Sequence, residues 1–230
     1  VHPDPFRTRQ LSPQRPMILR PVGFGKVGSC LINVLMSDRF KVAVFSSGSG
    51  SNFEAIVKAD IPNVEISFLF CNVADAYVLE RAKNLAVDST FLSHKSFESR
   101  KDFEKEILLK IKEYDIDLIV LAGFKRILSP FFVQHFDKKI INLHPSLLPS
   151  FPGLNAPRQA VEYGAKFTGC TVHFVDDGVD TGPIILQGLV EILDSDDEES
   201  LLAKIHEKEH QILPLAIKLI SEGKVKRIEG

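Results

Sequence analysis

Residues 117–144 read DLIVLAGFKRILSPFFVQHFDKKIINLH, with a short apolar run at each end of the stretch. The run at 117–123 is almost wholly apolar, and the run at 139–144 ends in a histidine. Runs without alternation of polar and apolar residues are typical of strands buried on both faces, as in a parallel sheet. This stretch therefore predicts two strands of such a sheet.

Strands alternate with helices on both sides of this stretch, which is the pattern of an α/β protein. We expect further strands at 42–46, 64–71, 90–92, 168–175 and 184–192, and helices at 52–59, 76–85, 99–114, 156–163 and 198–220. The predicted fold is α/β: a mostly parallel, doubly wound sheet with helices on both faces, a smaller C-terminal β extension and a long terminal helix.

The composition is that of an ordinary globular protein: 230 residues, 44% hydrophobic and 25% charged. A net charge of -2 argues against a nucleic-acid binder that works by bulk electrostatics. Three cysteines without a CxxC pair indicate neither a disulfide framework nor a zinc knuckle, and no apolar run has the length of a membrane span. We expect a soluble, cytoplasmic protein with small-molecule substrates and neither nucleic-acid nor membrane partners.

Residues 1–38 differ from the rest, because they begin with a Pro- and Arg-rich segment that is poor in apolar residues. Gly23, Gly25 and Gly28 form a GxGxxG pattern, but Pro21 interrupts the strand that a dinucleotide site needs before it. A targeting peptide is another interpretation of this basic segment. We expect residues 1–38 to be a disordered or non-native extension, and residues 39–230 to form a single domain.

The first candidate site is the sequence SSGSGSN at 46–52, between a predicted strand and a predicted helix. Small residues allow a sharp turn, and the free N–H groups at a helix start can bind an anion. The Walker lysine is absent, so the pattern does not indicate a triphosphate P-loop. The alternative is a plain Gly/Ser turn with a Ser or Asn cap.

Asn142 and His144 form the second candidate site, because alternate residues of a strand project to the same side. Together they can donate hydrogen bonds to one oxyanion and move a proton. A lone histidine at a strand end is more often structural, but an Asn and a His that share a face are less easily explained that way.

Asp176, Asp177 and Asp180 lie in a glycine-flanked loop after a predicted strand and form the third candidate site. They lack the alternating ligand spacing and the terminal Glu of an EF-hand loop, so calcium is not indicated. The alternative is a solvated β-turn.

The fourth candidate is HEKEH at 206–210, a formal match to the zincin pattern HExxH on a predicted helix. In a zincin both histidines bind zinc and Glu207 is the general base. There is no obvious third ligand, and Pro214 follows within about one turn of His210.

Taken in order, five segments resemble the phosphoribosylglycinamide formyltransferase family. They are SGSGSN, LAGFKRILSP, INLHPSLLPSFPGLNAPRQA, GCTVHFVDDGVDTGPIILQ and the terminal EHQILP, and the resemblance runs from about residue 41 to the C-terminus. Related formyltransferases share the HPSLLP and DxGPIIxQ blocks. Methionyl-tRNA formyltransferase would add a C-terminal barrel, and formyltetrahydrofolate deformylase would add a regulatory domain in front. We expect neither in this length.

The family implies transfer of a formyl group from 10-formyltetrahydrofolate to the amine of glycinamide ribonucleotide, without a metal. By resemblance, Asn142 and His144 are the catalytic donors, and Asp180 holds His144 in its charged form and relays the amine proton through water. The resemblance also implies that His173 lies next to these three residues and helps to hold them in position. A carboxylate beside a histidine favours its charged form.

The resemblance also assigns binding residues on both sides of the catalytic group. Those for the ribonucleotide are Gly50, Ser51, Asn52 and Glu209, which gives HEKEH an explanation other than zinc. Those for the folate are Arg100, Lys125, Arg126, Ile127 and Leu128, with Asn142 shared. After PGL the family often has histidines where this chain has Asn155 and Pro157, and we interpret those positions as tolerant.

Two other functions stay open on the sequence alone. One is a related formyl-group enzyme, which acts on another amine or hydrolyses 10-formyltetrahydrofolate. The second is a non-catalytic folate- or nucleotide-binding module, which would have no use for the proton-transfer residues Asn142, His144 and Asp180.

Overall fold

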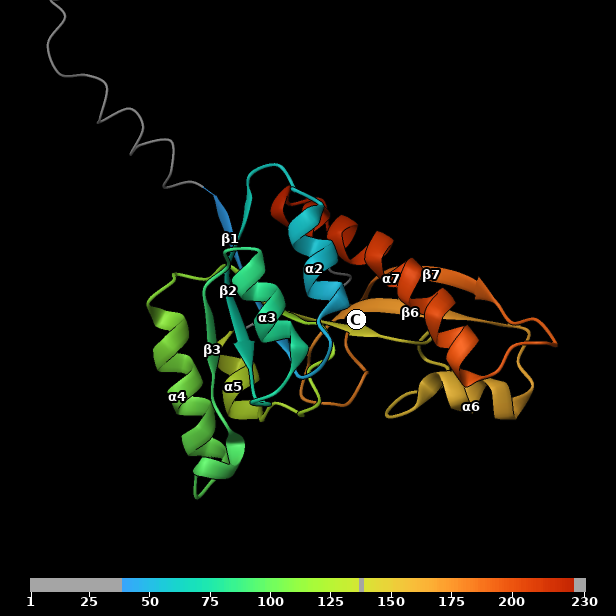
Figure 1. Ribbon diagram of the computed structural model, residues 1–230, viewed down its shortest axis with the longest axis horizontal. Helices are drawn as coiled ribbons and strands as arrows, with labels where there is room; N and C mark the ends of the chain where they lie inside the picture. The colour runs from blue at the N-terminus through green and yellow to red at the C-terminus, as the bar shows by residue number, and fades with distance from the viewer. Residues whose placement is uncertain (1–38, 137–138, 226–230) are drawn as a thin grey trace, which may run out of the picture. The chain divides into compact units, whose positions relative to one another are not determined.

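A computed structural model describes residues 39–136 and 139–225 of the chain (Figure 1). Its elements in chain order are β1 (Phe40–Ser46), α2 (Ser51–Lys58), β2 (Val64–Cys71), α3 (Tyr77–Asn84), β3 (Ser89–Phe91), a short 3-10 turn (His94–Ser96), α4 (Arg100–Lys112), β4 (Leu118–Leu121), α5 (Pro130–His135), β5 (Ile140–His144), α6 (Ala156–Tyr163), β6 (Phe167–Phe174), β7 (Ile184–Glu191) and α7 (Glu198–Ser221).

All seven described strands lie in one sheet, in the order β3-β2-β1-β4-β5-β6-β7. The pairs from β3 to β5 are parallel, whereas β6 pairs antiparallel with both β5 and β7. The predicted α/β fold with a mostly parallel sheet is therefore confirmed. The C-terminal β extension is the continuation of that sheet, because β6 pairs directly with β5.

Apolar side chains alternate between the two faces of the central strands. Val42 and Val44 of β1 pack with α2, α3, α6 and α7, and Ala43 and Phe45 pack on the other face with α4 and α5. In Figure 1 the helices α2, α3 and α7 lie on the viewer's side of the sheet. Helices on both faces explain why the central strands read as continuous apolar runs.

The sequence analysis missed α5, which has only six residues. A helix of that length is too short to show a 3.6-residue period. The sequence signal that could have found it is Ser129 followed by Pro130, a capping residue before a proline at the first helical position. In the structure the Ser129 side chain accepts a hydrogen bond from Phe132 N at 3.4 Å.

The predicted N-terminal extension, with the GxGxxG glycines, lies outside the described residues. The prediction of a domain boundary at residue 39 stays a prediction. Among the helices that the structure describes, none is long and apolar enough to cross a membrane.

Candidate active site

The loops that follow β1, β2 and β4 are joined at the carboxyl edge of the sheet. Ser47 N donates to Gly123 O at 3.1 Å, and Ser47 Oγ donates to Asn72 Oδ1 at 2.6 Å. Lys125 N in turn donates to Ser47 Oγ at 2.9 Å. Parallel strands bring these loops to one edge, which is where ligands bind in open α/β sheets.

Asn142, His144 and Asp180 meet on one face of the sheet. Asn142 and His144 alternate along β5 with Ile140, which packs on the α4 and α5 side. Asp180 comes from the loop between β6 and β7, with its Oδ1 3.4 Å from Asn142 Nδ2 and its Oδ2 3.4 Å from His144 Nδ1. The three residues predicted to be catalytic are thus neighbours.

The ring of His144 is 4% exposed and faces two atoms that only accept hydrogen bonds. Nε2 donates to Phe151 O at 2.9 Å, while Nδ1 faces the Asp180 carboxylate. Each ring nitrogen therefore faces an acceptor, so the ring is held in one orientation.

His173 lies directly beside Asn142, because the two residues pair across β5 and β6. His173 Nδ1 donates to Phe174 O at 2.9 Å, and its Nε2 lies 3.2 Å from Asn142 Nδ2 and 3.7 Å from Asp180 Oδ1. His173 therefore orients the Asn142 amide from behind, in keeping with its predicted supporting position.

Asp180 is held by its backbone as well as by its side chain. Its φ is 56°, a left-handed conformation that few residues other than glycine adopt, and Gly153 N donates to its Oδ2 at 2.9 Å. Burial alone raises the pKa of Asp180, but the contacts with His173 and Gly153 and the charge of His144 outweigh it and lower that pKa. The group therefore remains a carboxylate at neutral pH.

A second cluster lies on the other face of the sheet, where α2 begins against α7. Gly50 is the N-cap of α2 with φ 77°, and Asn52 Nδ2 donates to Glu209 Oε2 at 2.8 Å. Asn52 Oδ1 is buried without a hydrogen-bond partner among the described residues. Gly50, Ser51, Asn52 and Glu209 are brought together as the resemblance implies.

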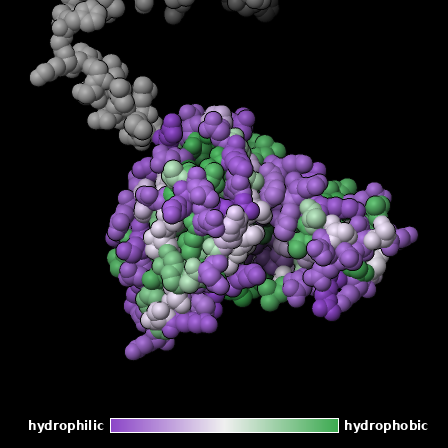
Figure 2. Space-filling model, viewed as in Figure 1, coloured by the Kyte–Doolittle hydropathy of each residue, from purple (hydrophilic) through white to green (hydrophobic). Residues whose placement is uncertain are grey.

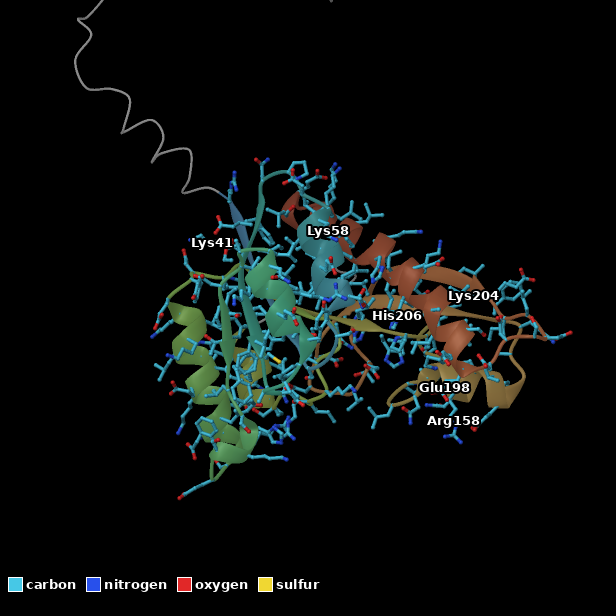
Figure 3. The ribbon with its side chains drawn as sticks, in the orientation of Figure 1. Lys41, Lys58, Arg158, Glu198, Lys204 and His206 are labelled. Atoms are coloured by element: carbon cyan, nitrogen blue, oxygen red, sulfur yellow. The ribbon has the colours of Figure 1, made fainter. Side chains whose placement is uncertain are left out.

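Glu209 is 4% exposed, and this burial raises its pKa to about 7 although the hydrogen bond from Asn52 opposes the shift. His206 lies one turn before it, with Nε2 3.9 Å from Glu209 Oε2. Figure 2 shows the surface hollowed beside α7, and Figure 3 shows His206 projecting from α7 on that side, toward α2 and α3.

The two histidines of HEKEH stack with ring centroids 6.5 Å apart. Within the described ranges 39–136 and 139–225, no group of three or more His, Cys, Asp or Glu side chains is placed to hold a metal ion. Glu209 faces Asn52, so this part of α7 belongs to the cluster with α2.

The third cluster contains the residues predicted to bind folate. Arg100, at the start of α4, donates through Nη2 to Ile127 O, and Lys125 N is fixed on Ser47. Ile127 is 66% exposed, whereas Leu128 is buried. An exposed apolar side chain beside a guanidinium suits a flat ring system that carries a carboxylate.

Comparison with known proteins shows the family of the chain. The family described as formyl transferase matches residues 40–217 of the chain. Phosphoribosylglycinamide formyltransferase of Escherichia coli K12 is 42% identical over 192 residues, which cover 82% of this chain and 91% of that protein. The chain belongs to the phosphoribosylglycinamide formyltransferase family. The resemblance seen in the sequence is therefore confirmed, and the chain is a formyltransferase.

Two further relatives place the chain within this formyltransferase family. The crystal structure of glycinamide ribonucleotide transformylase 1 from Symbiobacterium toebii superposes with a TM-score of 0.81 at 42% identity, and covers 85% of this chain and 93% of that one. The trifunctional purine biosynthetic protein adenosine-3 of Drosophila pseudoobscura is 44% identical over 200 residues. The match covers 85% of this chain but only 15% of that longer protein.

Asn155 and Pro157, which the sequence analysis interpreted as tolerant positions, lie at the start of α6. Asn155 is the N-cap of α6 with φ 57°, a left-handed conformation that Asn tolerates better than most residues, and Pro157 lies in the first turn. Both residues thus favour the start of a helix.

Sequence reasoning missed Arg81 of α3, which holds the loop at 46–52. Arg81 Nε donates to Ser49 O at 2.9 Å, and its guanidinium pairs with Glu54 of α2. Nothing in the local sequence of α3 points to this contact, because it joins residues that only the fold brings together.

Proposed function

We propose that this chain transfers the formyl group of 10-formyltetrahydrofolate to the amine of glycinamide ribonucleotide. The products are formylglycinamide ribonucleotide and tetrahydrofolate, a step of de novo purine biosynthesis. The observation that carries the proposal is the cluster of Asn142, His144 and Asp180 on one face of β5. The names of the Escherichia coli and Symbiobacterium toebii relatives, which include this ribonucleotide, support the proposal.

In the proposed reaction the amine attacks the formyl carbon, and the carbonyl oxygen takes the electron pair to become an oxyanion. The imidazolium of His144 and the amide of Asn142 donate to that oxygen. Their 3.4 Å contacts with Asp180 are long, and such contacts tighten or exchange when substrate binds.

Asp180 accepts the amine proton through a water molecule in this proposal. The oxyanion then re-forms the carbonyl as the carbon–nitrogen bond to the folate breaks, and the folate nitrogen leaves with the proton that Asp180 returns through the water. The lowered pKa of Asp180 keeps it ionised, so it both receives the proton and stabilises the His144 cation. No metal or covalent nucleophile takes part.

The two binding clusters complete the proposal. Gly50, Ser51 and Asn52 bind the phosphate at the start of α2, and Glu209 contacts the ribose. Arg100 and the segment at 125–128 bind the folate. The hydrogen bond from Lys125 N to Ser47 Oγ joins the loop at 46–52 to the segment at 125–128. In this proposal the two substrates meet at the catalytic cluster.

We also propose that the enzyme works in the cytoplasm on small molecules alone, as one domain at 39–230, without nucleic-acid partners. Of its cysteines, Cys71 and Cys170 are free and buried, which fits a reducing compartment.

The decisive experiment supplies purified protein with both substrates and follows the formation of tetrahydrofolate. We expect product only when glycinamide ribonucleotide is present, and formylglycinamide ribonucleotide in equal amount by mass spectrometry. Tetrahydrofolate formed without the ribonucleotide would indicate a hydrolase. Turnover with another amine alone would indicate a related transferase, and binding without turnover would indicate a binding module.

A further inference from the structure

Glu104 is a buried carboxylate that the proposed reaction does not use. It lies on α4 between Phe103 and Lys105 and is 1% exposed. A buried charge is costly unless it is paired and hydrogen-bonded. A carboxylate at such a position must therefore be stabilised by its hydrogen-bond partners.

Both oxygens of Glu104 are occupied. Oε1 accepts from Ser129 N at 2.8 Å and from Arg100 Nε at 3.3 Å, while Oε2 accepts from Ser129 Oγ. Ser129 is the N-cap of α5 and directly follows Leu128. The carboxylate thus joins the first turn of α4 to the end of the loop after β4.

Arg100 is the partner that reaches solvent, since its side chain is 43% exposed. One edge of its guanidinium is fixed by Glu104, and Nη2 donates to Ile127 O. An arginine with free rotamers loses entropy when it binds a ligand, and an arginine already fixed loses less. Ser129 therefore fixes the carboxylate, and the carboxylate fixes the guanidinium.

We propose that Glu104 is a positioning residue of the folate subsite, which holds Arg100 in the orientation that receives an anionic part of the folate. This inference rests on the proposed function, because that function assigns the folate to Arg100 and the loop at 125–128. Glu104 acts through Arg100 and touches neither substrate.

The test is Glu104→Met, which keeps the length of the side chain and removes both acceptors. We expect the KM for 10-formyltetrahydrofolate to rise about tenfold, the scale of one lost charge-assisted hydrogen bond. The KM for glycinamide ribonucleotide and kcat should stay within about twofold, because neither depends on Arg100. Glu106→Met, two residues along α4 and outside this network, is the matched control and should behave as wild type.

Two further variants separate positioning from general structural damage. Glu104→Gln retains one acceptor oxygen and should restore most of the folate KM. In an Arg100→Ala background, Glu104→Met should change the folate KM by less than about twofold, because the residue it acts through is gone.

An unchanged folate KM in Glu104→Met, or a full additional effect in the Arg100→Ala background, would overturn the inference. If Glu104→Met does not fold, Ser129→Ala removes only the hydroxyl and should raise the folate KM about threefold; no change there overturns it too. If the wild type transfers no formyl group, the proposed function fails instead. The same variants are then compared by calorimetric binding of tetrahydrofolate.

Discussion

At the scale of single residues, Asp180 combines several tasks in one carboxylate. One oxygen faces Asn142, while the other accepts from Gly153 N and faces His144. Its left-handed backbone costs free energy that the surrounding contacts offset, as is typical of functional positions. These contacts predict that removing the charge harms the reaction more than the fold.

We predict that Asp180→Asn lowers kcat about a hundredfold or more, because the variant loses the proton acceptor and the charge that stabilises the His144 cation. Both KM values should change much less, since the loss belongs to the transition state. Steady-state kinetics check this, with Asp177→Asn, an exposed neighbour in the same loop, as the control.

His144→Ala should be similarly slow, and the double variant far less impaired than the product of the two effects. A nearly wild-type rate for a folded Asp180→Asn would contradict the assignment.

Glu209 gives a prediction about pH, since burial raises its pKa from the usual 4.5 to about 7. Between these values the folded protein holds a proton that the unfolded chain has released, so stability falls as pH rises through this window. The effect is at most about 3 kcal/mol. Denaturant unfolding at pH 5 and pH 8 should show this loss in wild type but not in Glu209→Gln. Equal pH dependence in both proteins would show that Glu209 is not the group responsible.

At the scale of elements, the ribonucleotide loop depends on how closely α2 and α3 approach each other. A Cβ on Gly50 would lie 2.4 Å from Val78 Cγ2, at the start of α3, and the φ of Gly50 is +77°. Glycine at this position is thus required by the packing of α3 as well as by the backbone conformation. The sequence predicts a phosphate loop at 46–52 but does not reveal the contact of Gly50 with Val78, because that contact joins two helices.

We predict that Gly50→Ala destabilises the protein by about 2 kcal/mol, from strain and overpacking together, and raises the ribonucleotide KM. Gly164→Ala is the matched control: its φ is +75°, but no atom lies within 4 Å of the added Cβ. It should cost only the backbone term, about 1 kcal/mol, with both KM values unchanged. Thermal unfolding and kinetics measure these effects. Equal damage to the ribonucleotide and folate KM values in Gly50→Ala would mean that the loop is structural only.

At the scale of the whole molecule, the sheet separates the proposed tasks. The residues that we propose as catalytic lie on the face that α4 and α5 cover, and Glu209 of α7 lies on the opposite face. The proposed substrates cross the carboxyl edge between them. The proposed reaction therefore uses the edge and both faces of the sheet, and the proposal assigns it no metal.

Elemental analysis of the purified protein should accordingly find no stoichiometric zinc, and a chelator should leave the rate unchanged. The histidines of HEKEH make this test informative, because two histidines one turn apart are common zinc ligands. One tightly bound zinc per chain, lost together with activity, would support a metal-dependent hydrolase instead.

The sequence by itself determined the α/β fold, the bounds of most elements and the family. Hydrophobic periodicity is a local property, and an element of eight residues, such as α6 or β2, is long enough to display it. The segments that carry the family resemblance are contiguous, so they too are readable without a fold. Asn142 and His144 could be paired from the two-residue period of a strand alone.

Only the tertiary structure decided which distant residues meet. Asp180 is 38 residues from Asn142, and Asn52 is 157 residues from Glu209, so no periodicity relates them. The pairing of β6 with β5, the anchoring of Ser49 by Arg81 and the burial of Glu104 under Arg100 and Ser129 likewise had no local signal. Such contacts depend on the packing of whole elements, and a pattern that extends over a few residues cannot contain that information.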